Sequence, residues 1–310
     1  MDYKPLSGRE FPRFSGIKTF FRLPYVPVDS DYDVGIVGVP YDGGVSYRPG
    51  ARFAPSKIRE MSSLGRGYHW SRQMNIIEKL KIADIGDCPT VPVSQEKTYT
   101  RMQNFFDNLM KLDKKFISVG GDHSTTLPLL RAAHKKHGKL RLIHFDAHLD
   151  TYPAAWDCEY HHGTFVRHAV EEGLIIPDKS IQIGIRGPLA SGDDLTFVNK
   201  HKINVTTVDD VRQDLGEFLS SLPNFGNDPT YISFDIDCLD PSYAPGTGTP
   251  VPGGLTTYET QKILQALKVK NLVGADIVEV CPPYDPTEIT SLAAVDTMFE
   301  LLCIMAISAK

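Results

Sequence analysis

The chain has 310 residues, with 33 basic and 38 acidic side chains, a formal net charge of −5 at pH 7 and a pI near 6.1. This balance argues against a nucleic-acid or anionic-membrane partner recognised through bulk charge. The hydrophobic share of 41% and the aromatic share of 10% exclude a disordered or fibrous chain and indicate a well-cored globular protein.

The cysteines and the apolar runs bear on where the protein resides and whether it contacts a membrane. The five cysteines are scattered and never form a CxxC pair, which argues against a disulfide framework or a structural zinc site. The N-terminus, MDYKPLSGREFPRF, lacks the apolar core of a secretory signal, and no apolar run approaches the ~18 residues that a membrane span needs. We expect a cytoplasmic protein with no membrane and no nucleic-acid partner.

A polar, proline-punctuated arm over residues 1–30 is followed by β-rich runs that alternate with helical patterns. The runs that predict strands are 33–39, 81–86, 115–120, 140–146, 180–185, 202–207, 230–237 and 272–280. The patterns that predict helices are 54–64, 95–114, 125–137, 163–173, 191–201, 208–222, 256–269 and 290–309. This alternation predicts an α/β fold with a mostly parallel sheet, although a closed eight-stranded barrel has the same periodicity. Without a repeat or a linker, we expect one domain over residues 1–310.

Acidic and imidazole side chains follow four of these strands, at the point where each strand ends. Asp146 closes one run, GGDHS follows the run 115–120, Asp235 and Asp237 close TYISFDID, and Glu279 closes LVGADIVEV. In open α/β sheets, sites form outside the carboxyl ends of the strands. The sequence therefore predicts a site at this edge.

Two acidic motifs and one histidine motif have the residue types and spacing of metal ligands. In DAHLD, Asp146, His148 and Asp150 stand at i, i+2 and i+4, which in extended backbone puts them on one side of the strand. SFDID repeats the spacing, and GGDHS adds His123 after two glycines. Four converging carboxylates would repel one another, whereas two divalent cations neutralise them. Thiolate-free, carboxylate-rich ligation favours manganese-like ions, and a metal pair can activate water near neutral pH.

An isolated Asp-x-Asp pair is more often a strand-end cap, and GGDH alone is more often a glycine turn. The three motifs together, GGDHS, DAHLD and SFDIDCLDPSYAPGTGTPVPGGL, resemble those of the ureohydrolase family, which includes arginase, agmatinase and guanidino-acid hydrolases. The resemblance runs from about residue 15 to the C-terminus and implies a three-layer αβα sandwich with an eight-stranded, mostly parallel sheet. It also implies two Mn²⁺, with Ni²⁺ and Co²⁺ able to use the same ligands.

The resemblance assigns roles to individual side chains. The residues that it implies as metal ligands are His123, Asp146, Asp150 and Asp235 for one ion and His148, Asp146, Asp235 and Asp237 for the other, so that Asp146 and Asp235 bridge. His162, in YHHGTF, matches a histidine that assists proton transfer, while the pattern favours a solvent-facing loop position for His161. Glu279 matches the acid that pairs with the substrate guanidinium, a geometry that a carboxylate can meet with two hydrogen bonds. A structural ion pair is the alternative for Glu279.

The implied reaction is hydrolysis of a guanidino C–N bond, which releases urea and an amine after proton delivery through Asp150 or His162. The loop TYPAAWDCEYHHGT differs from the loop with which arginases recognise arginine. Agmatine leads, because Asp157 or Glu159 can meet its second cation.

The alternative substrates are guanidino acids (4-guanidinobutyrate, 3-guanidinopropionate or a proclavaminate-like compound), whose carboxylate would face Arg48, Arg52 or Arg186, and free guanidine under Trp156. A metal-dependent deacetylase or phosphatase and a metal-free assembly module are functions of other classes. The complete ligand set argues against all three. The segment SGIKTFFRLPY has the pattern of an arm that exposes Phe20, Phe21 and Tyr25. In the family such arms often pack against neighbouring subunits, which implies a homo-oligomer (trimer or hexamer); the alternative is an arm that folds back on its own chain.

Overall fold

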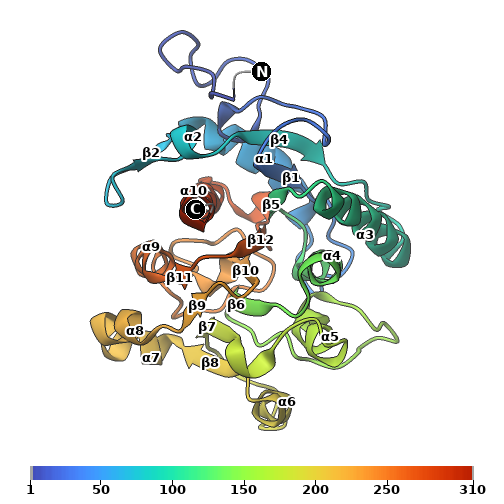
Figure 1. The fold of residues 1–310 in the computed structure, drawn as a ribbon. Coiled ribbons are helices and arrows are strands. Elements are labelled where there is room, and N and C mark those ends of the chain that lie inside the picture. The colour runs from blue at the N-terminus through green and yellow to red at the C-terminus, as the bar shows by residue number, and fades with distance from the viewer. Residues whose placement is uncertain (1–2, 309–310) are drawn as a thin grey trace.

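A single parallel sheet organises the computed structural model, which describes residues 3–308. Its strand order is β4-β1-β5-β12-β10-β6-β7-β8, and every neighbouring pair is parallel (Figure 1). The bounds of these strands are β1 (Val34–Gly38), β4 (Ile82–Asp87), β5 (Lys115–Val119), β6 (Arg141–Phe145), β7 (Ile181–Ile185), β8 (Asn204–Thr207), β10 (Thr230–Asp235) and β12 (Leu272–Val278). The sheet is open, so the sandwich is confirmed and the barrel is not.

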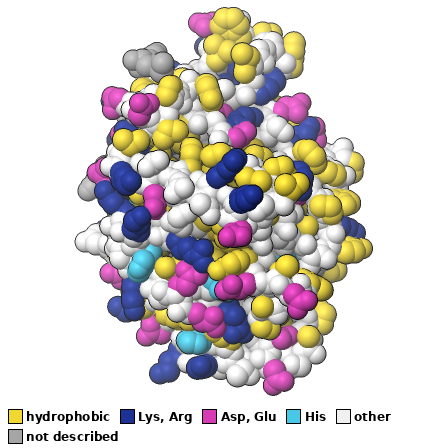
Figure 2. Space-filling model, turned by 90° about the vertical axis from the view of Figure 1, so that its right-hand side faces the viewer, with side chains coloured by type: hydrophobic (Ala, Val, Ile, Leu, Met, Phe, Trp, Pro, Cys, Tyr) yellow, Lys and Arg dark blue, Asp and Glu magenta, His cyan; other side chains and the backbone are white. Residues whose placement is uncertain are grey.

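Helices cover both faces of the sheet, which explains why its central strands are buried at every residue except Lys115, the first of β5. One layer contains α3 (Gln95–Lys111), α4 (Thr126–His137), α5 (Phe165–Glu171) and α6 (Asp194–His201). The other contains α1 (Ala54–Met61), α2 (Ile76–Lys79), α7 (Val208–Gln213), α8 (Leu215–Ser221), α9 (Thr257–Ala266) and α10 (Ile289–Ser308). On the face formed by α3 to α6, basic and acidic side chains are interspersed (Figure 2).

The predicted helix 208–222 is two helices in the structure. Asp214 interrupts it with an extended backbone (φ −157°), and its carboxylate accepts the Glu217 amide at the start of α8. The end of the predicted helix 256–269 is instead β11 (Lys268–Val269), which pairs with β9 (Asn224–Gly226). A short hairpin of β2 (Tyr68–His69) and β3 (Met74–Asn75) has no predicted counterpart.

Helix α10 has the length and composition of a membrane span, with a mean hydropathy of 1.7 over 18 residues. The expectation that no segment comes near such a run is therefore wrong for this helix. However, 78% of that window is buried inside the protein, between the sheet and α1, α2 and α9. Helix α10 is a core helix.

The N-terminal arm packs on its own chain more closely than expected. Phe20 is fully buried and Phe21 is 7% exposed, whereas Tyr25 is 67% exposed. The Phe20 amide donates to Asp84, and the Arg59 guanidinium lies 4.3 Å from the Phe20 ring centre. The interpretation of Phe20 and Phe21 as exposed aromatics is therefore wrong, and that of Tyr25 is confirmed.

Candidate metal centre

Four adjacent strands of the sheet, β5, β12, β10 and β6, direct the predicted site residues to one edge. Gly120 and Gly121, both with φ near +88°, turn the chain sharply after β5 and allow His123 to open a short 3-10 turn. The sheet rule is confirmed: all six predicted ligands lie at the carboxyl ends of these strands.

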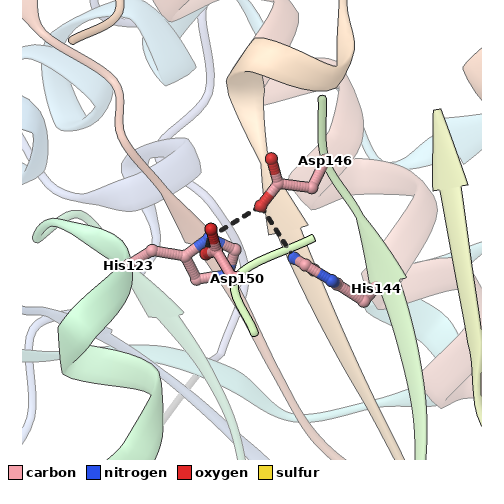
Figure 3. A group of neighbouring side chains, drawn as sticks. All are labelled: His123, His144, Asp146 and Asp150. Carbon is pink, nitrogen blue, oxygen red and sulfur yellow. Dashed lines mark hydrogen bonds and ion pairs between the residues drawn. The ribbon is translucent and has the colours of Figure 1, made fainter. Parts of the chain in front are cut away.

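The first group of ligand atoms surrounds His123. Its Nδ1 lies 3.1 Å from Oδ2 of Asp146 and 3.0 Å from Oδ2 of both Asp150 and Asp235. The second group surrounds His148, whose Nδ1 lies 3.2 Å from Oδ1 of Asp146 and 3.1 Å from Oδ2 of Asp237. Asp146 therefore contributes one oxygen to each group (the first group is shown in part in Figure 3). Asp235 directs Oδ2 to the first group, while its Oδ1 accepts the Asp237 amide at 2.8 Å, so the bridging role of Asp235 stays a prediction.

The ligands converge through turns and not, as expected, through extended backbone. The strand β6 ends before Asp146, and Asp150 has a left-handed backbone (φ +51°). Residues 236–238 form a 3-10 turn that Asp235 caps. A non-glycine residue in the left-handed region is strained, and such strain is concentrated at functional sites.

The donor set fits two divalent cations. Ligand atoms of an octahedral ion with bonds of about 2.1 Å lie about 3 Å apart, the spacing found in both groups. Nδ1 of His123 and Oδ2 of Asp237 are buried without a hydrogen-bond partner. Burial raises the pKa of Asp235 well above its ordinary value, and the charges of Asp237 and Asp146 raise it further. The described protein groups leave this charge unbalanced, and two cations balance it.

A second cluster adjoins the ligands at the end of β12. Oε1 of Glu279 accepts the His123 amide at 2.8 Å and lies 3.2 Å from Nδ1 of His162, while Nε2 of His162 lies 2.7 Å from Oγ of Ser46. Oε2 of Glu279 is buried and has no hydrogen-bond partner. Glu279 also has a left-handed backbone (φ +63°). An unpaired carboxylate oxygen beside the ligands is suited to a cationic substrate group.

Two of the arginines named for a substrate carboxylate have partners within the protein. The five N–H groups of Arg186 donate to backbone carbonyls of residues 184, 237, 238, 239 and 251. Arg52 pairs with the buried Asp42. We therefore correct the expected role of Arg186: it joins the rim segment GTGTPVPGG (residues 246–254) to the turn that follows β10, and no N–H remains for a substrate.

Arg186→Met is expected to lower the free energy of unfolding by about 3 kcal/mol, because carbonyls that accept charged hydrogen bonds lose their donor. Urea denaturation followed by circular dichroism measures this change. Arg212→Met is the matched control, since its guanidinium binds Gly254 and Glu259 on the protein surface. Unchanged stability with a raised KM for a guanidino acid would return Arg186 to the substrate pocket.

The remaining predicted residues lie on the loop 152–161, between Asp150 and His162. Trp156 is 70% exposed and, with Asp157, has a left-handed backbone at the loop tip. Asp157 and Glu159 are exposed, and neither carboxylate has a hydrogen bond or ion pair to the described residues. The prediction that His161 faces solvent is wrong: it is buried and holds the loop base, with Nε2 3.1 Å from the Pro153 carbonyl and Nδ1 accepting the Gly163 amide.

Comparison with known proteins places this site in a family. Residues 32–303 match the arginase family. The chain belongs to the arginase family. Guanidinopropionase of Pseudomonas aeruginosa is 42% identical to it, over 99% of this chain and 97% of that protein. Agmatinase of Cronobacter sakazakii is 43% identical, over 93% of this chain and 92% of that protein.

Among solved structures, proclavaminate amidinohydrolase from Streptomyces clavuligerus superposes with a TM-score of 0.91 at 41% identity, covering 96% of this chain and 99% of that one. This arginase-family chain is thus an amidinohydrolase that acts on C–N bonds of linear amidines, and its buried His/Asp cluster fits a binuclear metal centre. The deacetylase, phosphatase and assembly-module alternatives have no such support.

Sequence reasoning missed several polar residues around this arginase-family centre. His144 lies beside Asp146, and Ser233 links Nε2 of His123 to the buried Asp276. Two of them carry a signal in the sequence: His144 stands two residues before Asp146 on the same strand, and Asp276 is an acid within an apolar strand. Ser46 has none, because a loop residue is brought to His162 only by the tertiary fold.

Proposed function

We propose that the enzyme hydrolyses agmatine to putrescine and urea, using two Mn²⁺ ions. The observation that carries the guanidino reaction is the free, buried Oε2 of Glu279 beside the six ligands. The agmatine tail is supported by two unpaired acidic side chains on the loop 152–161, Asp157 and Glu159, and by the internal pairing of Arg52 and Arg186. Carboxylate-rich ligation without thiolates supports manganese.

In this proposal, the protein binds the substrate guanidinium through Glu279, and His123, Asp146, Asp150, Asp235, His148 and Asp237 hold the two ions. The bound ions supply a water that is nucleophilic near neutral pH. Glu279 is fixed by the His123 amide and by His162, so that its free oxygen keeps one orientation. The guanidinium carbon is thereby presented to the ligand cluster in a fixed position.

His162 is the proton donor to the departing amine in this proposal, with Asp150 as the alternative. Burial lowers the pKa of His162, but the hydrogen bond and charge of Glu279 outweigh it and raise the pKa to about 9. The imidazolium form therefore predominates at neutral pH and is lost as the pH rises through 9. A donor with this pKa suits delivery of a proton to an amine.

Above pH 9, kcat is therefore expected to fall by about tenfold per pH unit, since the reactive form is the protonated one. Steady-state kinetics between pH 7 and 10.5 would measure this decline, with metal content checked at each pH. His162→Gln removes the titrating group and should remove the decline as well as most of the activity. A wild-type profile that stays flat to pH 10.5 would assign proton delivery to Asp150.

A guanidino acid is the second candidate, and Arg48 favours it. Its guanidinium lies 5.4 Å from the Tyr47 ring centre and 5.1 Å from that of Tyr284. It has no ion pair with the described residues. Its backbone carbonyl and Oε2 of Glu279 both face Gly248, at 3.2 and 3.4 Å from where a Cβ would stand. The backbone of Arg48 thus lies near Glu279, and its guanidinium, which no described carboxylate pairs, is available to a substrate carboxylate.

Urea release from the manganese-loaded enzyme tests these candidates directly. The substrates are agmatine, 4-guanidinobutyrate, 3-guanidinopropionate, arginine and free guanidine, each with and without a chelator. We expect the highest kcat/KM for agmatine, and complete loss of urea with the chelator. If a nickel reload also yields no urea from any of them, the proposed substrate class is wrong.

Single-charge variants identify the tail contact. If agmatine is the substrate, Glu159→Gln or Asp157→Asn is expected to raise its KM by about tenfold, the effect of losing one charged hydrogen bond of about 1.5 kcal/mol. Arg48→Met should leave that KM unchanged or lower it. The opposite pattern, with a raised KM for a guanidino acid in Arg48→Met alone, would select the second candidate.

We also propose a cytoplasmic homo-oligomer, a trimer or hexamer. All five cysteines are free, as expected in a reducing compartment. The arm exposes Phe14 (86%) and Ile17 (94%), and such apolar side chains are often covered by another subunit. Light scattering after gel filtration tests the oligomer, and Phe14→Ser with Ile17→Ser should lower the mass if the arm forms the contact.

A further inference from the structure

A histidine that is not among the six ligands lies beside the metal cluster. His144 is fully buried near the end of β6, with Nε2 2.8 Å from Oδ2 of Asp146. That oxygen is the one that Asp146 directs toward His123. In Figure 3, the oxygen lies between the rings of His123 and His144. Phe165 packs edge-on against His144, with ring centres 5.1 Å apart, and fixes its ring plane.

The position of the His144 proton follows from its other neighbour, Gln182 of β7. Nε2 of Gln182 donates to the Leu149 carbonyl at 2.7 Å, which identifies this end of the side chain as the amide nitrogen. The same nitrogen lies 2.9 Å from Nδ1 of His144. Nδ1 therefore accepts a hydrogen bond and carries no proton. In the neutral ring the proton is on Nε2, where it points at Asp146.

We propose that His144, held in this tautomer by Gln182, is a positioning residue that orients Asp146 for the metal pair. This inference rests on the metal centre of the proposed function. The two oxygens of Asp146 each accept one protein N–H: Oδ2 from His144, and Oδ1 from the His148 amide at 2.6 Å. One further lone pair on each oxygen then remains for an ion, so the carboxylate is held in its bridging orientation.

Gln182 has a second part in this arrangement. Its bond to the Leu149 carbonyl anchors the loop between His148 and Asp150, which bear one ligand of each group. Without the N–H of His144, the Asp146 carboxylate can rotate. Without Gln182, the His144 proton is no longer confined to Nε2, and the loop loses its anchor at the Leu149 carbonyl. Partners behind the ligands typically contribute 10–100-fold to metal affinity, and we expect about 30-fold here.

Four variants of the full-length protein test this positioning. His144→Phe keeps a ring without the donor, His144→Gln offers an amide N–H near the Nε2 position, and Gln182→Met removes the tautomer partner. His69→Phe is the matched control: buried His69 of β2 has Nε2 2.9 Å from Oε1 of Glu300, outside the cluster. The readouts are Mn²⁺ stoichiometry after dialysis, the rate of Mn²⁺ transfer to a chelator, and the Mn²⁺ electron paramagnetic resonance spectrum.

We expect His144→Phe and Gln182→Met to release Mn²⁺ about 30-fold and about 10-fold faster than wild type, with one ion lost before the other. His144→Gln should restore retention to within about threefold, and His69→Phe should lower thermal stability alone. If His144→Phe does not fold, Gln182→Met decides. Equal release rates in all folded variants would overturn the positioning role. If the wild type itself retains no metal, the metal centre has failed, and not only this inference.

Discussion

Asp146→Asn is expected to lower kcat/KM by about 10³-fold, since a metal pair contributes several kcal/mol of transition-state stabilisation and each 1.4 kcal/mol is tenfold in rate. Among the carboxylates of residues 3–308, Asp146 has one oxygen beside the histidine of each ligand group, so an amide there weakens the binding of both ions. Metal analysis of the purified variant should find fewer than two ions per chain. Urea assays at saturating Mn²⁺ should recover only a small part of the activity.

The matched control is Asp84→Asn, which changes another buried aspartate that is held by Arg59 and lies outside the cluster. That variant should lose stability and keep its metal. An Asp146→Asn protein that holds two ions and retains wild-type kcat/KM would contradict the bridging role.

Glu279→Gln is expected to lower kcat/KM by about 100-fold, because a hydrogen bond to a charged group contributes about 1.5–3 kcal/mol. The amide carbonyl can still accept the His123 amide, so the metal content should stay at the wild-type value. The variant should also lower the pKa of His162, since Glu279 is what raises it. Kinetics with the preferred guanidine, together with metal analysis, separate these effects.

Glu300→Gln changes another buried glutamate, one that contacts His69 and Gln265. It should leave kcat/KM unchanged. Loss of metal from Glu279→Gln would mean that Glu279 supports the ligands and not the substrate.

The strands could be predicted from the sequence because they are short apolar runs bounded by turn residues. The pattern alone fits both an open sheet and a barrel, and the resemblance to the ureohydrolase family favoured the open sheet. The site could be predicted for a related reason. Parallel strands end at one edge, so the acids that follow β6, β10 and β12 must meet there. The ligands could therefore be predicted without knowing the backbone conformation at each position.

Other features depend on tertiary contacts that no local pattern contains. The burial of Phe20 requires Asp84 and Arg59, which lie more than thirty residues away in the chain. The sequence left Arg186 available to a substrate, but in the fold its N–H groups donate to five backbone carbonyls, of which only that of residue 251 belongs to the rim. The turns at Asp150 and at residues 236–238 are likewise set by close packing. The prediction of extended backbone was wrong there, although the ligand side chains lie together as predicted.

The strand order has a consequence for biosynthesis. Strand β12 is the last of the sheet in the chain, yet it lies between β5 and β10 and pairs with both. Until residues 272–278 emerge from the ribosome, the earlier strands can form only two separate half-sheets, β4-β1-β5 and β10-β6-β7-β8. Each presents an open edge, which favours aggregation. His123 and the aspartates of β6 and β10 belong to different halves, so the nascent chain gains its complete metal site only when its C-terminal segment closes the gap.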